Sequence, residues 1–193
     1  HGLSGRVVGG GVVDEPSGSR DVGDLLGASH DLCGGHVVAS FDGVVKLALD
    51  ALRKTTGHLA INLAADTCAD RDFRKAFIDQ LKGQQELCGR LWVEVPEAAT
   101  VSHFDAFHEL CRALKAQGCK VGIENFGRKL VEVDKFADLG VDYVKVDTSF
   151  VRDIDQNEGN REFLGGLCKM VHGIGIMVIA VGVQNQRELD TLA

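Results

Sequence analysis

The sequence lacks the signatures of several common protein classes. Its six cysteines form no CxxC pair and have no cysteine or histidine neighbours at the spacing of a zinc site. The longest apolar runs, such as IGIMVIAVGV, are much shorter than the ~20 residues that span a bilayer. No charged stretch precedes an apolar one near the beginning of the chain, so we expect no signal peptide. The sequence therefore predicts no zinc site, no membrane segment and no secretory signal.

An excess of basic residues is also missing. The chain has 21 lysines and arginines against 28 aspartates and glutamates, which gives a net charge of −7. Phosphate backbones attract positively charged surfaces, so we expect no general binding to DNA or RNA. A local basic pocket could still hold an anion.

The cysteines lie mostly in apolar patterns. Such positions are typical of buried free thiols in a reducing compartment. We therefore expect a cytoplasmic protein, or the cytoplasmic part of a larger one. The six residues are Cys33, Cys68, Cys88, Cys111, Cys119 and Cys168.

Patterns of short strands and of helices alternate along most of the chain. This alternation predicts a parallel sheet with helical crossovers. About six such units favour a (β/α) barrel, and an open doubly wound sheet is the alternative. A full barrel normally has about 250 residues, so we expect the barrel to be incomplete. Strands are predicted over 6–13, 59–63, 91–95, 121–123, 143–146 and 177–180, and helices over 21–32, 36–54, 70–81, 103–116, 131–139, 160–172 and 186–193.

Polar side chains stand at the carboxyl ends of four consecutive predicted strands, and these ends meet on one face of a parallel barrel. Their oxygens suit magnesium or calcium, and a lysine can hold a phosphate oxygen as a point charge. One polar residue at a strand end is usually a helix cap or a turn former, but four in succession favour a shared pocket. The residues are Asn62, Glu94 with Glu97, Glu124 with Asn125, and Lys145 with Asp147.

Other chemistries find less support in the sequence. Ser149 has no convincing histidine partner, and the seven histidines lack the spacing of metal ligands. The glycines at 9–11 are not followed by the helix start that a phosphate-binding loop needs.

Five stretches resemble the EAL domain, the bacterial phosphodiesterase domain for cyclic di-GMP. They read AINLAADTCADRDF, LWVEVPEA, IENFG, LGVDYVKVDTSFVRDI and IAVGVQNQREL, in the family's order and spacing. Residues 36–193 match well and residues 1–35 diverge, so we expect one EAL-like domain over 1–193. The resemblance implies an α/β fold, a modified triose-isomerase-type (TIM-type) barrel that is incomplete at its N- and C-terminal ends.

The resemblance also implies a reaction and roles for single residues. Active members use two magnesium or manganese ions to activate the water that opens cyclic di-GMP to linear pGpG. Lys145 matches a lysine that contacts this water or the phosphate, and Asp147 matches a supporting acid. Glu97 matches the glutamate that holds the loop Phe126 to Leu130. Metal ligands would be Asn62, Glu94 and Glu124, and the ligand-binding set would be Asn62, Glu94, Glu124, Asn125, Lys145 and Asp147.

The chain departs from the family at several reactive positions. The Glu-Ala-Leu signature aligns with Gly11-Val12-Val13, and a phosphate-contacting arginine aligns with Glu15. Val181 replaces a metal ligand and proposed base, and the family's Asp-Asp pair reads Glu124-Asn125. Loss of one such group can cost roughly 10²–10⁴-fold in rate. We therefore predict a degenerate domain whose catalytic Lys145 and remaining metal ligands are vestigial.

We expect this domain to bind cyclic di-GMP without hydrolysing it and to relay binding to a protein partner. The alternative is a protein-interaction module that has lost the nucleotide, and a residual metal-dependent phosphodiesterase is less favoured. We expect no cofactor, since only the residual enzyme would need magnesium or manganese. The resemblance implies a bacterial cytoplasmic location, often within a larger protein, and homodimerisation near Lys129 to Phe136.

Overall fold

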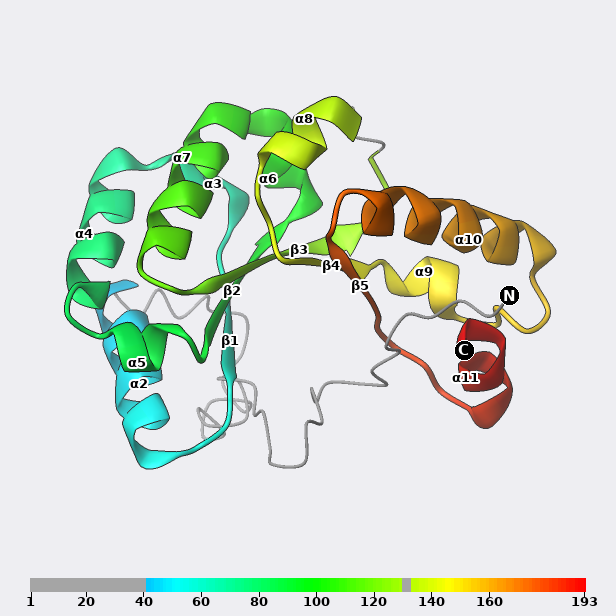
Figure 1. Ribbon diagram of the computed structural model, residues 1–193, viewed down its shortest axis with the longest axis horizontal. Helices are drawn as coiled ribbons and strands as arrows, with labels where there is room; N and C mark the ends of the chain where they lie inside the picture. Colours follow the sequence, from blue (N-terminus) through cyan, green and yellow to red (C-terminus); the bar gives the residue numbers. More distant parts are fainter. Residues whose placement is uncertain (1–40, 130–132) are drawn as a thin grey trace, which may run out of the picture.

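The structure is a computed structural model, which describes residues 41–129 and 133–193 (Figure 1). The strand predicted over 6–13, the helix predicted over 21–32 and residues 36–40 of the next helix lie outside these ranges. In chain order the elements are α2 (Phe41–Lys54), β1 (Leu59–Asn62), α3 (Ala65–Ala69), α4 (Arg71–Leu81), α5 (Gln85–Cys88), β2 (Leu91–Pro96), α6 (Glu97–Ser102), α7 (Phe104–Ala116), β3 (Lys120–Phe126), α8 (Val133–Asp138), β4 (Tyr143–Val146), α9 (Thr148–Val151), α10 (Glu158–Gly173), β5 (Met177–Ala180) and α11 (Gln186–Leu192).

The strands of the described chain form one parallel sheet in the order β1-β2-β3-β4-β5. Each strand pairs with the strand that follows it, and the sheet has no point where the order reverses. A doubly wound sheet needs such a reversal, whereas a barrel adds its strands in sequence. The predicted α/β fold is confirmed, and the strand order is that of part of a TIM-type barrel.

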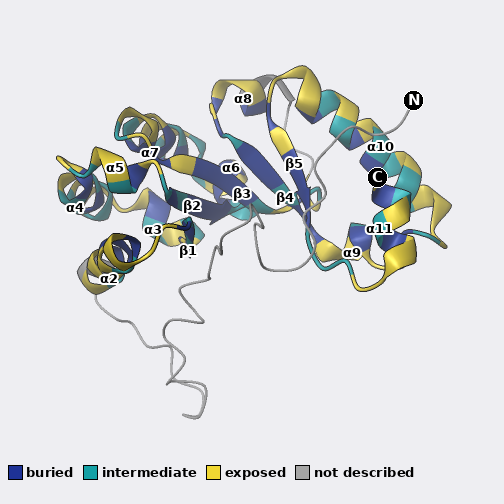
Figure 2. Cartoon of the chain, turned by 60° about the horizontal axis from the view of Figure 1, so that its bottom comes forward, coloured by how far each residue is buried: buried dark blue, intermediate teal, exposed yellow. Residues whose placement is uncertain are grey.

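The two faces of the sheet differ in polarity because successive side chains on a strand point to opposite sides. One face, here called the outer face, carries buried apolar residues that join the hydrophobic core with the helices. Figure 2 shows this core as dark blue strand surfaces and helix stripes, with exposed residues on the far sides of the helices. The outer-face residues are Leu59, Ile61, Leu91, Val93, Val95, Val121, Ile123, Val144, Val146, Val178 and Ala180. The opposite, inner face carries the polar residues of the candidate site.

A bulge interrupts the pairing of β3 with β4. Ile123 pairs with Val144, but the next pair is Phe126 with Val146, so β3 uses one residue more than β4. Asn125 takes up this extra residue with a positive φ of 54°. The bulge turns Phe126 toward the outer face, where its ring lies 4.9 Å from that of Phe136. The strand is therefore longer than the predicted 121–123, and Glu124 lies within it rather than beyond its end.

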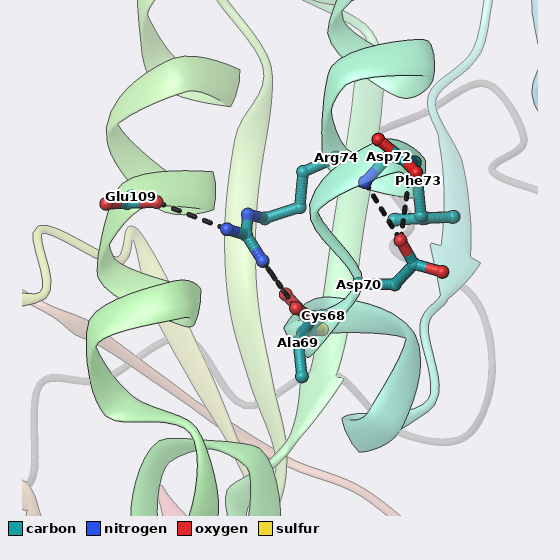
Figure 3. Close-up of polar contacts among 7 residues, drawn as sticks. All are labelled: Cys68, Ala69, Asp70, Asp72, Phe73, Arg74 and Glu109. Atoms are coloured by element: carbon teal, nitrogen blue, oxygen red, sulfur yellow. Dashed lines mark hydrogen bonds and ion pairs between the residues drawn. The ribbon is translucent and has the colours of Figure 1, made fainter.

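Polar contacts fix the junction of α3, α4 and α7 (Figure 3). Arg74 on α4 donates hydrogen bonds to the carbonyl oxygens of Cys68 and Ala69 at the end of α3, both at 2.9 Å. The same guanidinium forms a 3.2 Å ion pair with Glu109 on α7. Asp70 caps α4 by accepting hydrogen bonds from two backbone N–H groups of the first turn. These contacts satisfy the ends of two short helices and hold them beside α7.

The described cysteines are free, and four of them are buried. Burial raises the pKa of the Cys68 thiol to about 11 and raises the thiol pKa of Cys111 and Cys119 further. These thiols therefore stay protonated at neutral pH and act as small apolar groups. None of the helices in the described ranges combines the length and hydrophobicity that a bilayer crossing requires.

Candidate functional site

Four polar residues of the inner face meet near the carboxyl ends of the first four strands. Asn62 lies on β1, Glu94 on β2, Glu124 on β3 and Lys145 on β4. In the register of the sheet Asn62 pairs with Glu94, and Pro96 pairs with Glu124. Parallel strands therefore bring together residues that are up to 83 positions apart in the sequence.

Glu94 is the buried centre of this cluster, with only 1% of the residue exposed. Lys145 Nζ lies 2.6 Å from its carboxylate, and the hydroxyl of Tyr143 donates a 2.8 Å hydrogen bond to Oε1. A buried carboxylate without partners would carry a large desolvation cost. The lysine and the tyrosine offset part of this cost by their contacts with Glu94.

The amide of Asn62 completes the contacts of the two carboxylates. Its hydrogen-bond partners require that its nitrogen faces Glu124 at 2.9 Å and Glu94 at 3.3 Å, because both are acceptors. Asn62 is therefore a donor in this arrangement, and its amide oxygen points away from the carboxylates.

Glu124 lies at the more exposed side of the cluster. Burial, together with the hydrogen bond and the charge of the neighbouring Glu94, raises the pKa of its carboxyl group from 4.5 to about 7. Lys145 Nζ, 3.6 Å from Glu124 Oε1, lowers this pKa without cancelling the rise. Glu124 can therefore exchange a proton near neutral pH.

The sequence predicted Asn125 and Asp147 as part of this site, but the structure places both outside the cluster of the four residues. Asn125 is an exposed residue in the bulge. Asp147 follows β4 and caps α9, where it accepts hydrogen bonds from the backbone N–H and the hydroxyl of Ser149. Its other oxygen forms a 2.6 Å ion pair with Arg128. Although burial opposes ionisation, the Ser149 bonds and the Arg128 charge lower the pKa of Asp147.

Glu97 holds the loop that follows β3. It lies at the start of α6, is buried, and accepts hydrogen bonds from the backbone N–H groups of Gly127 at 3.2 Å and Lys129 at 2.8 Å. Arg128 between them contacts Asp147, so the described part of this loop is tied to the ends of both β2 and β4. The remaining loop residues, 130–132, lie outside the described ranges.

The described residues of this cluster do not by themselves make a two-metal centre. Two divalent ions about 3.5–4 Å apart need several bridging carboxylates, and this cluster offers two. Both contact Lys145. Val181, directly after β5, adds no ligand. No group of three or more histidine, cysteine, aspartate or glutamate side chains in 41–129 and 133–193 is arranged to hold a metal. Gly11 and Glu15 lie outside these ranges.

Three residues that the sequence did not single out contribute to the site: Tyr143, Gly122 and Arg128. Tyr143 stands two positions before Lys145, which places both side chains on the inner face of β4. That spacing could have indicated Tyr143. The roles of Gly122 and Arg128 depend on sheet register and on loop geometry, which leave no local signal in the sequence.

The strand order and the cluster of carboxylates, amide and lysine define a TIM-type barrel domain with a polar site at its carboxyl strand ends. A model of the EAL domain family matches residues 39–193. The chain therefore belongs to the EAL domain family, and the resemblance to it is confirmed.

Three relatives show what this chain is similar to. The cyclic di-GMP phosphodiesterase NbdA of Pseudomonas aeruginosa is 27% identical over 78% of this chain and 20% of its own length. The Vibrio cholerae LapD S helix-GGDEF-EAL structure, bound to c-di-GMP, is 28% identical with a TM-score of 0.72, over 79% of this chain and 38% of that one. The FimX EAL domain of Pseudomonas aeruginosa, also bound to c-di-GMP, is 26% identical with a TM-score of 0.67, over 79% and 61%.

The similarity covers only one part of these relatives. The chain spans about a fifth of the length of the curated relatives that it matches first. What the whole relatives do therefore does not transfer directly to this chain, and its function has to be argued from its own site.

Proposed function

We propose that this domain binds cyclic di-GMP at the carboxyl ends of its strands without hydrolysing it, and relays binding to a protein partner. The observation that carries the proposal is the position of Lys145, whose ammonium group lies between the carboxylates of Glu94 and Glu124. The ammonium group of Lys145 thus offsets part of the negative charge of the two carboxylates.

The donor set supports the proposed absence of hydrolysis. A two-ion mechanism needs carboxylates that are free to bridge metals, and here both contact Lys145. The position of the family's proposed base carries Val181, which cannot accept a proton. Each of these differences opposes activation of a water molecule.

Binding of the dinucleotide is supported by the cations that remain. Lys145 is 22% exposed at the side chain, so a phosphate oxygen can reach its ammonium group from solvent. Arg128 is 64% exposed and is anchored through Asp147 just beyond the same strand. Charge-assisted bonds from lysine and arginine are the usual way to hold phosphodiesters. The similarity to EAL domains described as bound to c-di-GMP supports the same ligand.

The loop after β3 offers a route for the relay. Arg128 belongs to this loop and pairs with Asp147, while Glu97 holds the loop backbone on either side. A phosphate that competes with Asp147 for Arg128 would release the loop from the end of β4. A partner that recognises one of the two loop positions would sense the nucleotide.

Isothermal titration with cyclic di-GMP, with and without magnesium, tests the proposal. We expect binding at micromolar or lower concentration that does not depend on magnesium, and no pGpG after prolonged incubation. Production of pGpG would show a residual phosphodiesterase. An absence of heat at high nucleotide concentration would favour an interaction module without nucleotide.

A matched pair of lysine variants locates the binding site. Lys145→Ala should abolish nucleotide binding, because it removes the cation of the cluster. Lys46→Ala removes an exposed lysine on α2 and should leave the affinity unchanged. Equal affinity of both variants would place the nucleotide elsewhere on the domain.

A further inference from the structure

A tyrosine on β4 reaches a glutamate on β2 across the strand between them. The register places Glu94 beside Gly122 on β3, and Gly122 beside Tyr143 on β4. The three residues thus form one row on the inner face of the sheet. The Tyr143 hydroxyl donates to Glu94 Oε1 at 2.8 Å, although a whole strand separates their backbones.

Glycine at position 122 makes this contact possible. A Cβ atom placed on Gly122 would lie 2.2 Å from Cζ of Tyr143 and 2.3 Å from Cε2. Such distances are far inside van der Waals contact, so any side chain at 122 would displace the ring. The aromatic ring therefore occupies the space that a β3 side chain would otherwise fill.

The surroundings of Tyr143 make its hydroxyl a hydrogen-bond donor to Glu94. The residue is 2% exposed, and its ring packs at 4.8 Å from that of Trp92 on β2. Burial, together with the charge of Glu94, raises the pKa of the Tyr143 phenol. The hydroxyl therefore stays protonated and donates permanently to the carboxylate.

We propose that Tyr143, seated on Gly122, is a positioning residue that fixes the Glu94 carboxylate and thereby the place of Lys145 in the nucleotide site. This inference rests on the proposed function for its effect on the ligand. With one oxygen held by Tyr143, Glu94 presents a fixed partner to Lys145 at 2.6 Å. Without the hydroxyl, the carboxylate can rotate and the ammonium group follows it.

The first test uses the protein without nucleotide. The ¹³C carboxyl resonance of Glu94 is assigned by its loss in Glu94→Gln, in protein labelled at glutamate carboxyl carbons. We expect Tyr143→Phe, which deletes only the hydroxyl, to shift this resonance while the circular dichroism spectrum stays that of the wild type. An unchanged Glu94 resonance in Tyr143→Phe would overturn the inference, whatever the protein binds.

The second test measures the affinity for cyclic di-GMP in a double-mutant cycle. Tyr143→Phe should weaken binding about tenfold in the wild-type background, the effect of losing one hydrogen bond to a charged group. In a folded Glu94→Ala background the same change should have no effect, since the tyrosine acts through Glu94. Equal weakening in both backgrounds would refute positioning through Glu94. If the wild type binds no nucleotide, the proposed function is refuted. The ¹³C experiment still tests whether Tyr143 fixes the Glu94 carboxylate.

A glycine pair provides the matched control. Gly122→Ala should displace the tyrosine and shift the Glu94 resonance as Tyr143→Phe does. Gly166→Ala on α10 adds a methyl group with no atom within 4 Å and should leave the resonance in place. A Glu94 resonance that responds equally to both alanines would contradict a specific role for Gly122.

Discussion

Replacement of Lys145 by methionine should destabilise the domain by an amount that grows with pH. The change keeps an unbranched side chain but removes the ammonium group 2.6 Å from Glu94 and 3.6 Å from Glu124. The nearly buried carboxylate of Glu94 then lacks the cation that Lys145 supplies. Breaking a fully buried ion pair costs about 3–5 kcal/mol, and the 22% exposure of Lys145 reduces our expectation to about 2 kcal/mol.

The dependence on pH comes from Glu124. Its carboxyl pKa is raised from 4.5 to about 7 in the folded protein, so the unfolded chain loses this proton first as the pH rises. Between these values the unfolded state binds fewer protons than the folded state, and the free energy of unfolding decreases with pH. Above the folded pKa the loss is complete and stays constant.

The size of this loss follows from the shift. Each pKa unit corresponds to about 1.36 kcal/mol, which sets an upper limit of about 3 kcal/mol. Since 27% of the Glu124 side chain is exposed, screening by water reduces the expected loss to about 1–2 kcal/mol. Lys145 lowers this pKa, so the methionine variant should have a still higher folded pKa, and its stability should keep falling above pH 7.

Urea unfolding at pH 5, 7 and 9 measures the difference between wild type and Lys145→Met. Trp92 is the only tryptophan of the chain and packs on Tyr143, so its fluorescence reports on unfolding next to the site. Lys46→Met serves as the control for an exposed lysine, and adding Glu124→Gln to both proteins should remove the pH dependence of the difference between them. A difference that is constant or shrinks with pH would refute this account of Lys145.

Two further outcomes follow from other parts of the structure. Glu97→Ala removes the acceptor of two loop hydrogen bonds, so we expect a loss of about 1–3 kcal/mol and faster amide exchange at Gly127 and Lys129, measured by NMR. Unchanged exchange at both amides would contradict the role of Glu97 in the loop. In a protein with Cys33→Ser and Cys168→Ser, a thiol reagent at pH 7.5 should react with the remaining, buried cysteines only after denaturant is added; fast reaction in the native protein would contradict their burial. These cysteines are Cys68, Cys88, Cys111 and Cys119.

Much of the fold could be predicted because its longer elements carry a clear hydrophobic period. The strands at 143–146 and 177–180 were predicted with the bounds that the structure shows, and the helix at 71–81 differs from the prediction by one residue. The short helices α3, α5, α6 and α9 were missed. Elements of four to six residues are too short to establish a 3.6-residue period, and packing rather than propensity stabilises them.

The candidate site could be predicted only as a set of strand ends. Parallel topology brought Asn62, Glu94, Glu124 and Lys145 together, as the prediction of converging strand ends requires. The contact of Tyr143 with Glu94 could not be foreseen, because it depends on the glycine that the register places between them. The position of Asn125 depends on a bulge, which a local sequence pattern does not reveal.

The bulge at Asn125 has a consequence for how such a domain can change over time. Asparagine and aspartate are the side chains other than glycine that most readily adopt a left-handed backbone, and Asn125 has a φ of 54°. Replacement of an aspartate by asparagine at this position therefore costs the fold almost nothing, although it removes a negative charge. The family resemblance places an aspartate here. A mutation from aspartate to asparagine here therefore meets almost no opposition from stability, so the stability of the fold does not preserve the charge at this position.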